Sequence, residues 1–243
     1  MTVLAVSPHL DDAAFSAGAT LARLARAGRR VVVVSVFTAS VPDPRGFALA
    51  CQLDKGLGPE VDYMALRRGE DAAACAALGV EPVHLPFREA PHRGYDSAPE
   101  LFDGVREGDT ADAALAPALA ALIDALAPDL ILAPQAVGGH VDHVQVVRAL
   151  DRLRPVAPIA WWRDFPYTVR SPEPKQPYAT RFDALPEVSV PVDAETEDAK
   201  RRACEAYASQ LDFQFGGVGG LRRRLADGAQ AELFRSAGWG GLG

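Results

Sequence analysis

The chain has 243 residues, of which 49% are hydrophobic, and its 25 Lys and Arg against 32 Asp and Glu give a formal net charge of −7. This balance excludes general disorder and argues against nucleic acid or an anionic membrane as a partner held by bulk charge. No apolar run approaches the roughly 20 residues that span a bilayer. The first residues do not resemble a signal peptide, and the three cysteines form no CxxC pair. We therefore expect a cytoplasmic protein with one domain over residues 1–243.

Short β-branched runs alternate with longer Ala- and Leu-rich stretches along most of the chain. Apolar periodicity predicts the following elements in chain order: strand 2–6, helix 13–27, strand 30–37, helix 62–78, strand 82–85, helix 111–126, strand 129–133, helix 141–153 and a helix at about 195–208. This alternation is typical of βαβ units. We expect an α/β fold in which helices flank a mostly parallel sheet, with the active-site loops at the carboxyl ends of the strands.

Three segments lack this pattern. Residues 38–61 contain Pro, Gly and Asp without periodicity, and we expect a long loop near the edge of a site. Residues 163–191 are rich in proline and are expected to form an irregular surface excursion. The Gly-rich tail from about residue 216 is expected to be partly mobile.

Three ionisable residues follow the first predicted strand: His9, Asp11 and Asp12. An imidazole and a carboxylate supply the nitrogen and oxygen ligands that zinc accepts, which leaves the second carboxylate free to act as a base. An aspartate at this position also commonly caps the helix that follows. This cluster alone therefore fits a metal site and a helix cap equally well.

A second cluster, with His140, Asp142 and His143, follows the predicted strand 129–133 in the same way. The alternative is a purely structural role, in which one of these residues caps a helix and the histidines lie on the surface. However, the two clusters contain three of the five histidines of the chain. They also follow strands at the edge where α/β folds bind their ligands. Together they favour a metal site in which one imidazole binds the ion and another, oriented by a carboxylate, lies nearby.

The two motifs resemble the PIG-L/LmbE-like family of zinc-dependent de-N-acetylases. Other segments that resemble the family occur in the same order: Arg67–Glu70 with Leu78-Gly79, Trp162–Tyr167, and Lys200 with Tyr207–Gln210. The resemblance spans about residues 1–212 and implies a Rossmann-like sheet. The usual first motif, His-Pro-Asp-Asp-Glu, is changed at Leu10 and Ala13, and the usual His-Pro-Asp-His is changed at Val141. These changes replace no ligand or base, so they bear on the substrate and the pocket shape.

The resemblance implies that His9, Asp12 and His143 bind one zinc ion per chain. It implies that Asp11 is the general base that takes a proton from water. The implied reaction is hydrolysis of the acetamide of an N-acetylglucosamine-type conjugate, a small molecule, to acetate and a free amine.

For His140 the resemblance implies a place beside the reacting carbonyl, where it stabilises the oxyanion or protonates the leaving amine. Asp142 is the carboxylate expected to orient an imidazole. A nearby cation disfavours a protonated imidazole, whereas neighbouring carboxylates favour one. We expect the carboxylates to prevail, so that His140 is protonated over part of the neutral range.

Arg67 and Arg68 are expected to anchor the site loop or to bind an anionic group of the substrate, with a solvated helix face as the alternative for at least one of them. Tyr167 is expected to stack on a sugar ring of the substrate, with packing as the alternative. Loops 38–61 and 163–190 are expected to select the substrate. The nearest alternative function is the same zinc chemistry on another amide, such as a thiol conjugate. A composition rich in Ala, Arg, Gly and Pro suggests a high-GC bacterial source, where family members act in natural-product pathways.

Two non-catalytic functions are weaker alternatives. A nucleotide-binding Rossmann protein requires a Gly-rich turn after the first strand, and residues 7–18 contain neither GxGxxG nor GxxxxGK[ST]. A sugar-binding relative without activity conflicts with the intact base and ligands. The sequence leaves the oligomeric state open.

Overall fold

The computed structural model describes residues 1–227 and 231–242. Its strands are β1 (Thr2–Ser7), β2 (Arg30–Ser35), β3 (Glu81–His84), β4 (Leu130–Pro134), β5 (Ile159–Trp162), β6 (Glu187–Pro191) and β7 (Ala231–Arg235). In this described part, the seven strands form one sheet in the order β3-β2-β1-β4-β5-β7-β6. Pairing is parallel from β3 to β5, and β7 is antiparallel to both β5 and β6. The expected α/β fold with a mostly parallel sheet is confirmed.

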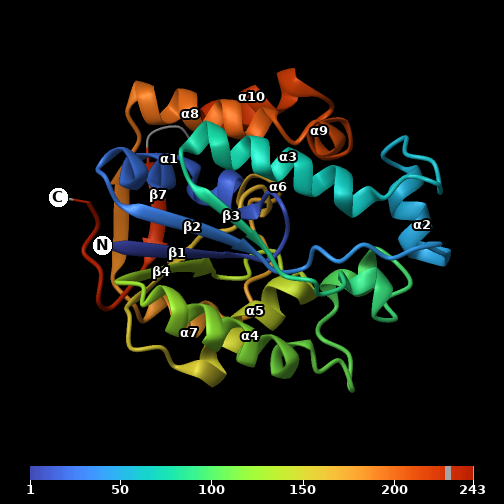
Figure 1. Cartoon of the computed structure of the whole chain (residues 1–243), viewed down its shortest axis with the longest axis horizontal. Coiled ribbons are helices and arrows are strands. Elements are labelled where there is room, and N and C mark those ends of the chain that lie inside the picture. The colour runs from blue at the N-terminus through green and yellow to red at the C-terminus, as the bar shows by residue number, and fades with distance from the viewer. Residues whose placement is uncertain (228–230, 243) are drawn as a thin grey trace.

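Helices cover both faces of the sheet (Figure 1). The α-helices are α1 (Asp12–Arg26), α2 (Gly46–Leu53), α3 (Tyr63–Leu78), α4 (Ala111–Leu126), α5 (Val141–Leu153), α6 (Tyr167–Arg170), α7 (Ala179–Asp183), α8 (Ala194–Glu205), α9 (Ala208–Phe215) and α10 (Val218–Asp227), with 3₁₀ turns η1 (Ala90–His92) and η2 (Pro99–Phe102). Helices α1, α3 and α8 pack together on one face, and α4 and α5 pack on the other (Figure 1).

The core has two layers because the central strands are buried on both faces. Successive side chains of a strand point to opposite faces. In β1, Val3 and Ala5 belong to the core cluster under α1 and α8, whereas Leu4 and Val6 belong to the cluster under α4 and α5. This arrangement explains why β1 and β2 are almost continuous apolar runs instead of alternating ones.

Two segments that were expected to be irregular contain regular secondary structure. The expected loop 38–61 contains α2, and the expected excursion 163–191 contains α6, α7 and the strand β6. Strand β5, Ile159–Trp162, lies just upstream, where no strand was predicted. Both β5 and β6 are only four or five residues long and are flanked by proline, so periodicity gives little signal there.

The segment after residue 216, which was expected to be partly mobile, contains the helix α10 and the strand β7. Residues 228–230 and 243 lie outside the described residues. Strand β7 is anchored by Glu232, whose carboxylate accepts hydrogen bonds from the backbone N–H groups of Ala19 and Thr20 at 3.0 and 2.7 Å. These groups follow a non-helical residue, Ala17, inside α1. Lys200 compensates the buried charge of Glu232 at 2.7 Å.

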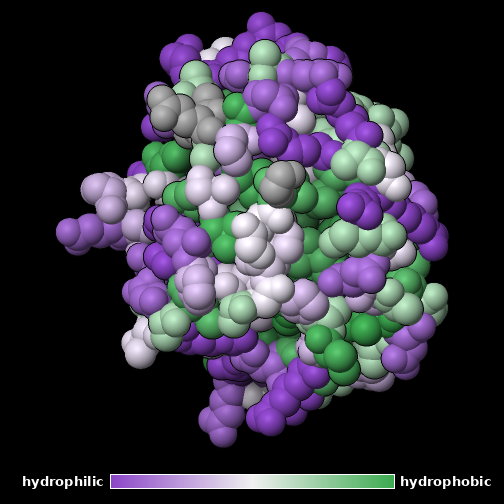
Figure 2. All heavy atoms as spheres, turned by 90° about the vertical axis from the view of Figure 1, so that its left-hand side faces the viewer, coloured by the Kyte–Doolittle hydropathy of each residue, from purple (hydrophilic) through white to green (hydrophobic). Residues whose placement is uncertain are grey.

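The carboxyl ends of β1, β2 and β4 face the side of the molecule on which α2 lies (Figure 1). Figure 2 views the opposite side, where hydrophilic side chains lie along the upper and lower margins. None of the helices in the described part of the chain has the length and apolar character required to cross a bilayer.

Candidate active site

The two predicted clusters meet at the carboxyl ends of β1 and β4. These strands are neighbours in the sheet, so the loops that follow them lie side by side. The ring centroid of His9 is 4.9 Å from that of His140 and 5.3 Å from that of His143. One nitrogen from each of the three rings lies within 4.8 Å of the others, an arrangement that could hold a metal ion.

The carboxylates of the first cluster do not cap α1. Asp11 occupies the N-cap position, but its side chain makes no capping hydrogen bond. The hydroxyl of Ser7 instead accepts the N–H of Ala13 at 3.0 Å. Asp12 Oδ2 accepts the backbone N–H of His9 at 2.8 Å, which holds this carboxylate beside the imidazole. The helix-cap alternative is therefore wrong for this cluster.

Asp12 lies between two imidazoles. Its Oδ2 is 3.2 Å from His9 Nδ1 and 3.2 Å from His143 Nε2. Ligands at 2.0–2.1 Å from a tetrahedral zinc ion lie about 3.3 Å from one another. In addition, His143 Nε2 is buried and has no hydrogen-bond partner among the described residues. These three donors therefore suit a tetrahedral metal ion.

Each of these imidazoles is held from behind by a carboxylate. His9 Nε2 donates to Asp142 Oδ2 at 2.9 Å, and His143 Nδ1 donates to Asp164 Oδ1 at 2.7 Å. Arg93 Nη2 lies 2.8 Å from the other oxygen of Asp142. Such partners fix which ring nitrogen faces a metal. Sequence reasoning gave no role to Asp164 or Arg93, although Asp164 follows a strand in the same way as the two clusters.

His140 differs from the other two histidines. It is the N-cap residue of α5, and its Nδ1 accepts the backbone N–H of Asp142 at 3.2 Å. The cap alternative is therefore correct for His140, although its side chain is buried. Burial lowers the pKa of His140 to about 3 and outweighs the opposing effect of Asp142. The expectation of a protonated His140 near neutral pH is wrong, and a neutral ring whose Nδ1 accepts carries its proton on Nε2.

The adjacent aspartates have different surroundings. Burial raises the pKa of Asp11 to about 6, although Arg67 acts to lower it. Asp11 Oδ2 lies 3.5 Å from Arg67 Nη2 and accepts a hydrogen bond from Gln214 Nε2 at 3.1 Å. Burial also disfavours the charge of Asp12, but His143 and His9 hold the pKa of Asp12 well below its usual range. Asp12 is thus a permanent anion, whereas Asp11 can exchange a proton near neutral pH.

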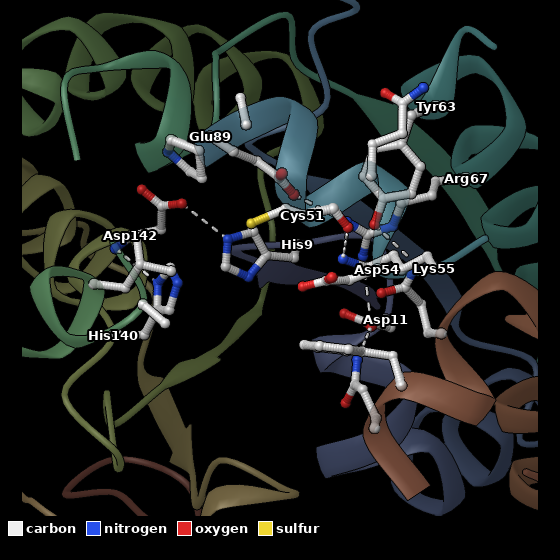
Figure 3. A pocket seen from close by; sticks show the side chains of 18 of the residues that line it. His9, Asp11, Cys51, Asp54, Lys55, Tyr63, Arg67, Glu89, His140 and Asp142 are labelled. Atoms are coloured by element: carbon white, nitrogen blue, oxygen red, sulfur yellow. Dashed lines mark hydrogen bonds and ion pairs between the residues drawn. The ribbon is translucent and has the colours of Figure 1, made fainter. Parts of the chain in front are cut away.

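A cavity of about 340 Å³ opens onto this cluster. Figure 3 shows His9 with Asp142 and His140 on one side, and Asp11 and Arg67 on the other. All five residues line the cavity. The charged groups therefore face a space that a small molecule can enter.

The three residues expected to contact substrate differ in position. Arg67 and Tyr167 line the cavity, and Arg67 is buried with its Nη1 donating to Glu89 Oε1 at 2.9 Å. Arg68 instead donates to the carbonyl oxygen of Thr38 at 2.6 Å, which ties α3 to the chain after β2. Arg68 therefore anchors the loop, which is one of the two roles expected for it, and it does not line the cavity.

Two glycines shape the turn before His140. Gly138 and Gly139 have φ values of +94° and +77°, which other residues rarely adopt. A Cβ atom on Gly138 would lie only 2.5 Å from Cγ of Tyr167. The Tyr167 ring therefore packs directly on this turn. Trp161 and Trp162, the other aromatic residues of this region, are buried in the core.

Known proteins are similar to this chain in sequence and in fold. The family model described as PIG-L, GlcNAc-PI de-N-acetylase, matches residues 4–153. The chain is 32% identical over 214 residues to 2'-N-acetylparomamine deacetylase of Streptomyces fradiae, covering 86% of this chain and 73% of the relative. It is 31% identical over 266 residues to 1D-myo-inositol 2-acetamido-2-deoxy-alpha-D-glucopyranoside deacetylase of Nakamurella multipartita, covering 96% and 88%.

A solved structure extends the similarity beyond the region of the family model. The zinc-inhibited form of teicoplanin deacetylase Orf2 matches with a TM-score of 0.79 at 27% identity, and the match covers 97% of each chain. Family model, curated relatives and solved structure all describe deacetylases, which cleave amide bonds. This chain therefore belongs to the PIG-L family of de-N-acetylases and is a hydrolase of amide C–N bonds.

Proposed function

We propose that this protein is a zinc-dependent deacetylase that converts an N-acetylglucosamine-type conjugate to acetate and a free amine. The main support for this proposal is the arrangement of His9 and His143. Each imidazole has one ring nitrogen 3.2 Å from Asp12 and hydrogen-bonds to a second carboxylate through its other ring nitrogen. The names of the two curated relatives, which specify an acetylated paromamine and an acetamido-glucopyranoside of inositol, support the sugar class.

His9 Nδ1, Asp12 Oδ2 and His143 Nε2 would hold the ion. A zinc ion bound there would act as a Lewis acid on the amide carbonyl and lower the pKa of water. Asp142 and Asp164 keep the two imidazoles in the required orientation, because each accepts the N–H of the ring nitrogen that points away from Asp12.

Asp11 is the general base in this proposal. Its carboxylate accepts a proton from the attacking water as the water oxygen bonds to the carbonyl carbon. When the C–N bond breaks, the same proton passes to the leaving nitrogen, which departs as the amine. Gln214 and Arg67 hold the carboxylate at the cavity wall during both transfers.

His140 is the oxyanion donor in this proposal. Its neutral ring carries the proton on Nε2, which can donate to the carbonyl oxygen as negative charge develops. We expect His140→Ala to keep metal and to lower kcat by about 10²–10³-fold. His140→Gln, whose amide also donates, should recover part of the loss. Metal loss in His140→Ala would identify His140 as a ligand, and an unchanged kcat would remove its catalytic role.

Asp164 is expected to tune metal affinity. In Asp164→Asn the side chain can still accept a hydrogen bond from His143 but loses its charge. The Kd for zinc, measured by competition with a chelating dye, should rise by about 10–100-fold. Asp183→Asn, a change of an exposed carboxylate on α7, is the control. An unchanged Kd would show that Asp164 does not orient the ligand.

The function itself is tested on the metal-loaded protein with a panel of N-acetylated sugars, acetylated thiol conjugates and simple acetamides, scored by amine release. We expect turnover of N-acetylglucosamine-type compounds and about one metal ion per chain. Turnover only of thiol conjugates would favour that amidase activity instead. A solved deacetylase of the teicoplanin biosynthesis pathway, 28% identical to this chain, supports a natural-product pathway as the setting, and we place this pathway in the cytoplasm.

A further inference from the structure

Arg93 contacts the histidine cluster from behind, although it does not line the cavity. It follows η1 in the connection between β3 and α4, and its side chain is only 15% exposed. Its Nη2 lies 2.8 Å from Oδ1 of Asp142, the carboxylate that accepts the N–H of His9. Figure 3 shows Asp142 beside the His9 ring. No step of the proposed hydrolysis uses this arginine.

The Arg93 guanidinium joins the two ends of the segment 88–109. At one end, Nη1 donates to the carbonyl oxygen of Arg88 at 2.7 Å. At the other end, Nε and Nη2 donate to the two carboxylate oxygens of Asp109 at 3.2 and 3.0 Å. The hydroxyl of Tyr95 donates to the same carboxylate at 2.9 Å. A planar fork of several N–H donors provides these contacts together, and lysine has no such fork.

The segment that Arg93 closes is bonded to the metal site and carries part of the cavity wall. The buried backbone N–H of Ala90 donates at 3.2 Å to Asp142 Oδ2, the same oxygen that accepts the imidazole N–H. Further along the segment, the ring of Phe102 lies 5.2 Å from that of His140. The position of the segment and the orientation of the imidazole therefore depend on one carboxylate.

This carboxylate is held at only one oxygen without Arg93. Asp142 is fully buried, and its Oδ2 has two donors, the His9 ring and the Ala90 backbone. Its Oδ1 accepts no hydrogen bond of ordinary geometry from the described residues, so the guanidinium in ion-pair contact compensates it. A buried charge deprived of its partner is costly. The carboxylate would rotate toward other donors, and Oδ2 would move away from the imidazole.

A second contact links Arg93 to the same imidazole. The guanidinium carbon lies 4.9 Å from the ring centroid of Phe37, a cation–π arrangement. The fully buried Phe37 ring lies 6.1 Å from the ring of His9. Two neighbours of the imidazole, Asp142 and Phe37, are therefore both in contact with this arginine.

We propose that Arg93 is a positioning residue of the metal centre, which closes the segment 88–109 and holds Asp142 so that His9 faces the ion. This inference rests on the proposed function, in which His9 is a ligand. By charge alone, removal of the guanidinium would strengthen zinc binding, because like charges repel. Loss of an orienting partner instead weakens metal binding. We expect orientation to prevail, because two carboxylates in contact with Arg93 already balance its charge.

The first test measures the Kd for zinc by competition with a chelating dye. Arg93→Gln should raise the Kd by about 10–100-fold. Arg93→Lys keeps the charge without the fork and should still raise the Kd by about tenfold. Arg106→Gln is the matched control, because Arg106 lies on the same segment with a side chain that is 46% exposed. It should leave the Kd unchanged.

An unchanged or lower Kd in Arg93→Gln, or a wild-type Kd in Arg93→Lys, would overturn the inference. If the wild-type protein bound no zinc, the proposed function would fail instead.

The second test separates positioning from a general loss of stability. Arg93 also lines a surface hollow together with Gly108 and Thr110, so a small cation can reach its place from solvent. In Arg93→Ala, millimolar guanidinium chloride, far below denaturing concentrations, should lower the Kd for zinc toward the wild-type value. Equal concentrations of ammonium chloride should not, and the wild-type Kd should respond to neither salt. A raised Kd in Arg93→Ala that guanidinium leaves unchanged would overturn the inference.

Discussion

Asp11→Asn is expected to keep its metal and to lower kcat by about 10²–10⁴-fold. The amide has nearly the same shape as the carboxylate and can still contact Gln214, but it cannot accept a proton from water. Burial raises the pKa of Asp11 to about 6, so the native carboxylate is charged at pH 8, where the comparison should be made. The measurements are kcat by amine release and metal content by elemental analysis.

Asp103→Asn is the matched control for this change, because Asp103 is an exposed carboxylate beside the cavity residue Phe102. It should leave both kcat and metal content unchanged. If Asp11→Asn lost its metal, the roles given to Asp11 and Asp12 would be exchanged. If it retained full kcat, the base would have to be another group.

His143→Ala is expected to abolish stable zinc binding. His143 is fully buried, and its Nε2 is the donor without a partner among the described residues. Without it, only His9 and Asp12 remain of the proposed ligand set. Metal content should fall from about one ion per chain to about a tenth or less at micromolar zinc, and turnover should fall with it.

Thermal unfolding separates metal loss from misfolding in this variant. A ligand that binds only the folded state raises Tm, so zinc should raise the Tm of the wild-type protein and not that of His143→Ala. The substitution also leaves Asp164 without its imidazole partner, which should cost about 1–3 kcal/mol. His92→Ala, which changes a cavity histidine outside the cluster, should keep the zinc-dependent rise. A normal zinc response in His143→Ala would contradict the proposed ligand set.

The proposed chemistry depends on a contrast between neighbouring residues. Asp11 and Asp12 are adjacent in sequence and both line the cavity, yet Asp11 lies beside Arg67 and Asp12 lies between two imidazoles. His140 and His143 lie three residues apart at the start of α5, the first as its N-cap, yet one accepts a backbone N–H and the other donates to a carboxylate. The proposed roles of general base, oxyanion donor and metal ligand rest on these differences in hydrogen-bond partners.

The sequence by itself determined the central βαβ framework and the position of both clusters. Apolar periodicity and the identity of the residues that directly follow a strand are local features of the sequence. They can therefore be recognised without knowledge of the tertiary structure. Parallel strands point the same way, so two clusters that each follow a strand had to emerge at one edge of the sheet. For this reason the two clusters could be expected to meet, whereas the ligand set of His9, Asp12 and His143 was implied by the resemblance to the PIG-L/LmbE-like family.

Only the tertiary structure decided which hydrogen-bond partners orient these residues and which protonation states they have. Asp142 pairs with His9 across 133 positions of sequence, and Asp164 reaches His143 only because β5 lies beside β4. The neutral state of His140 follows from its burial, which outweighs the carboxylates that the sequence places near it. Strand β7 likewise escaped prediction, because it is stabilised by pairing with distant strands and by Glu232 bonding to α1. Burial and long-range partners depend on how the strands are ordered, and no local pattern contains that order.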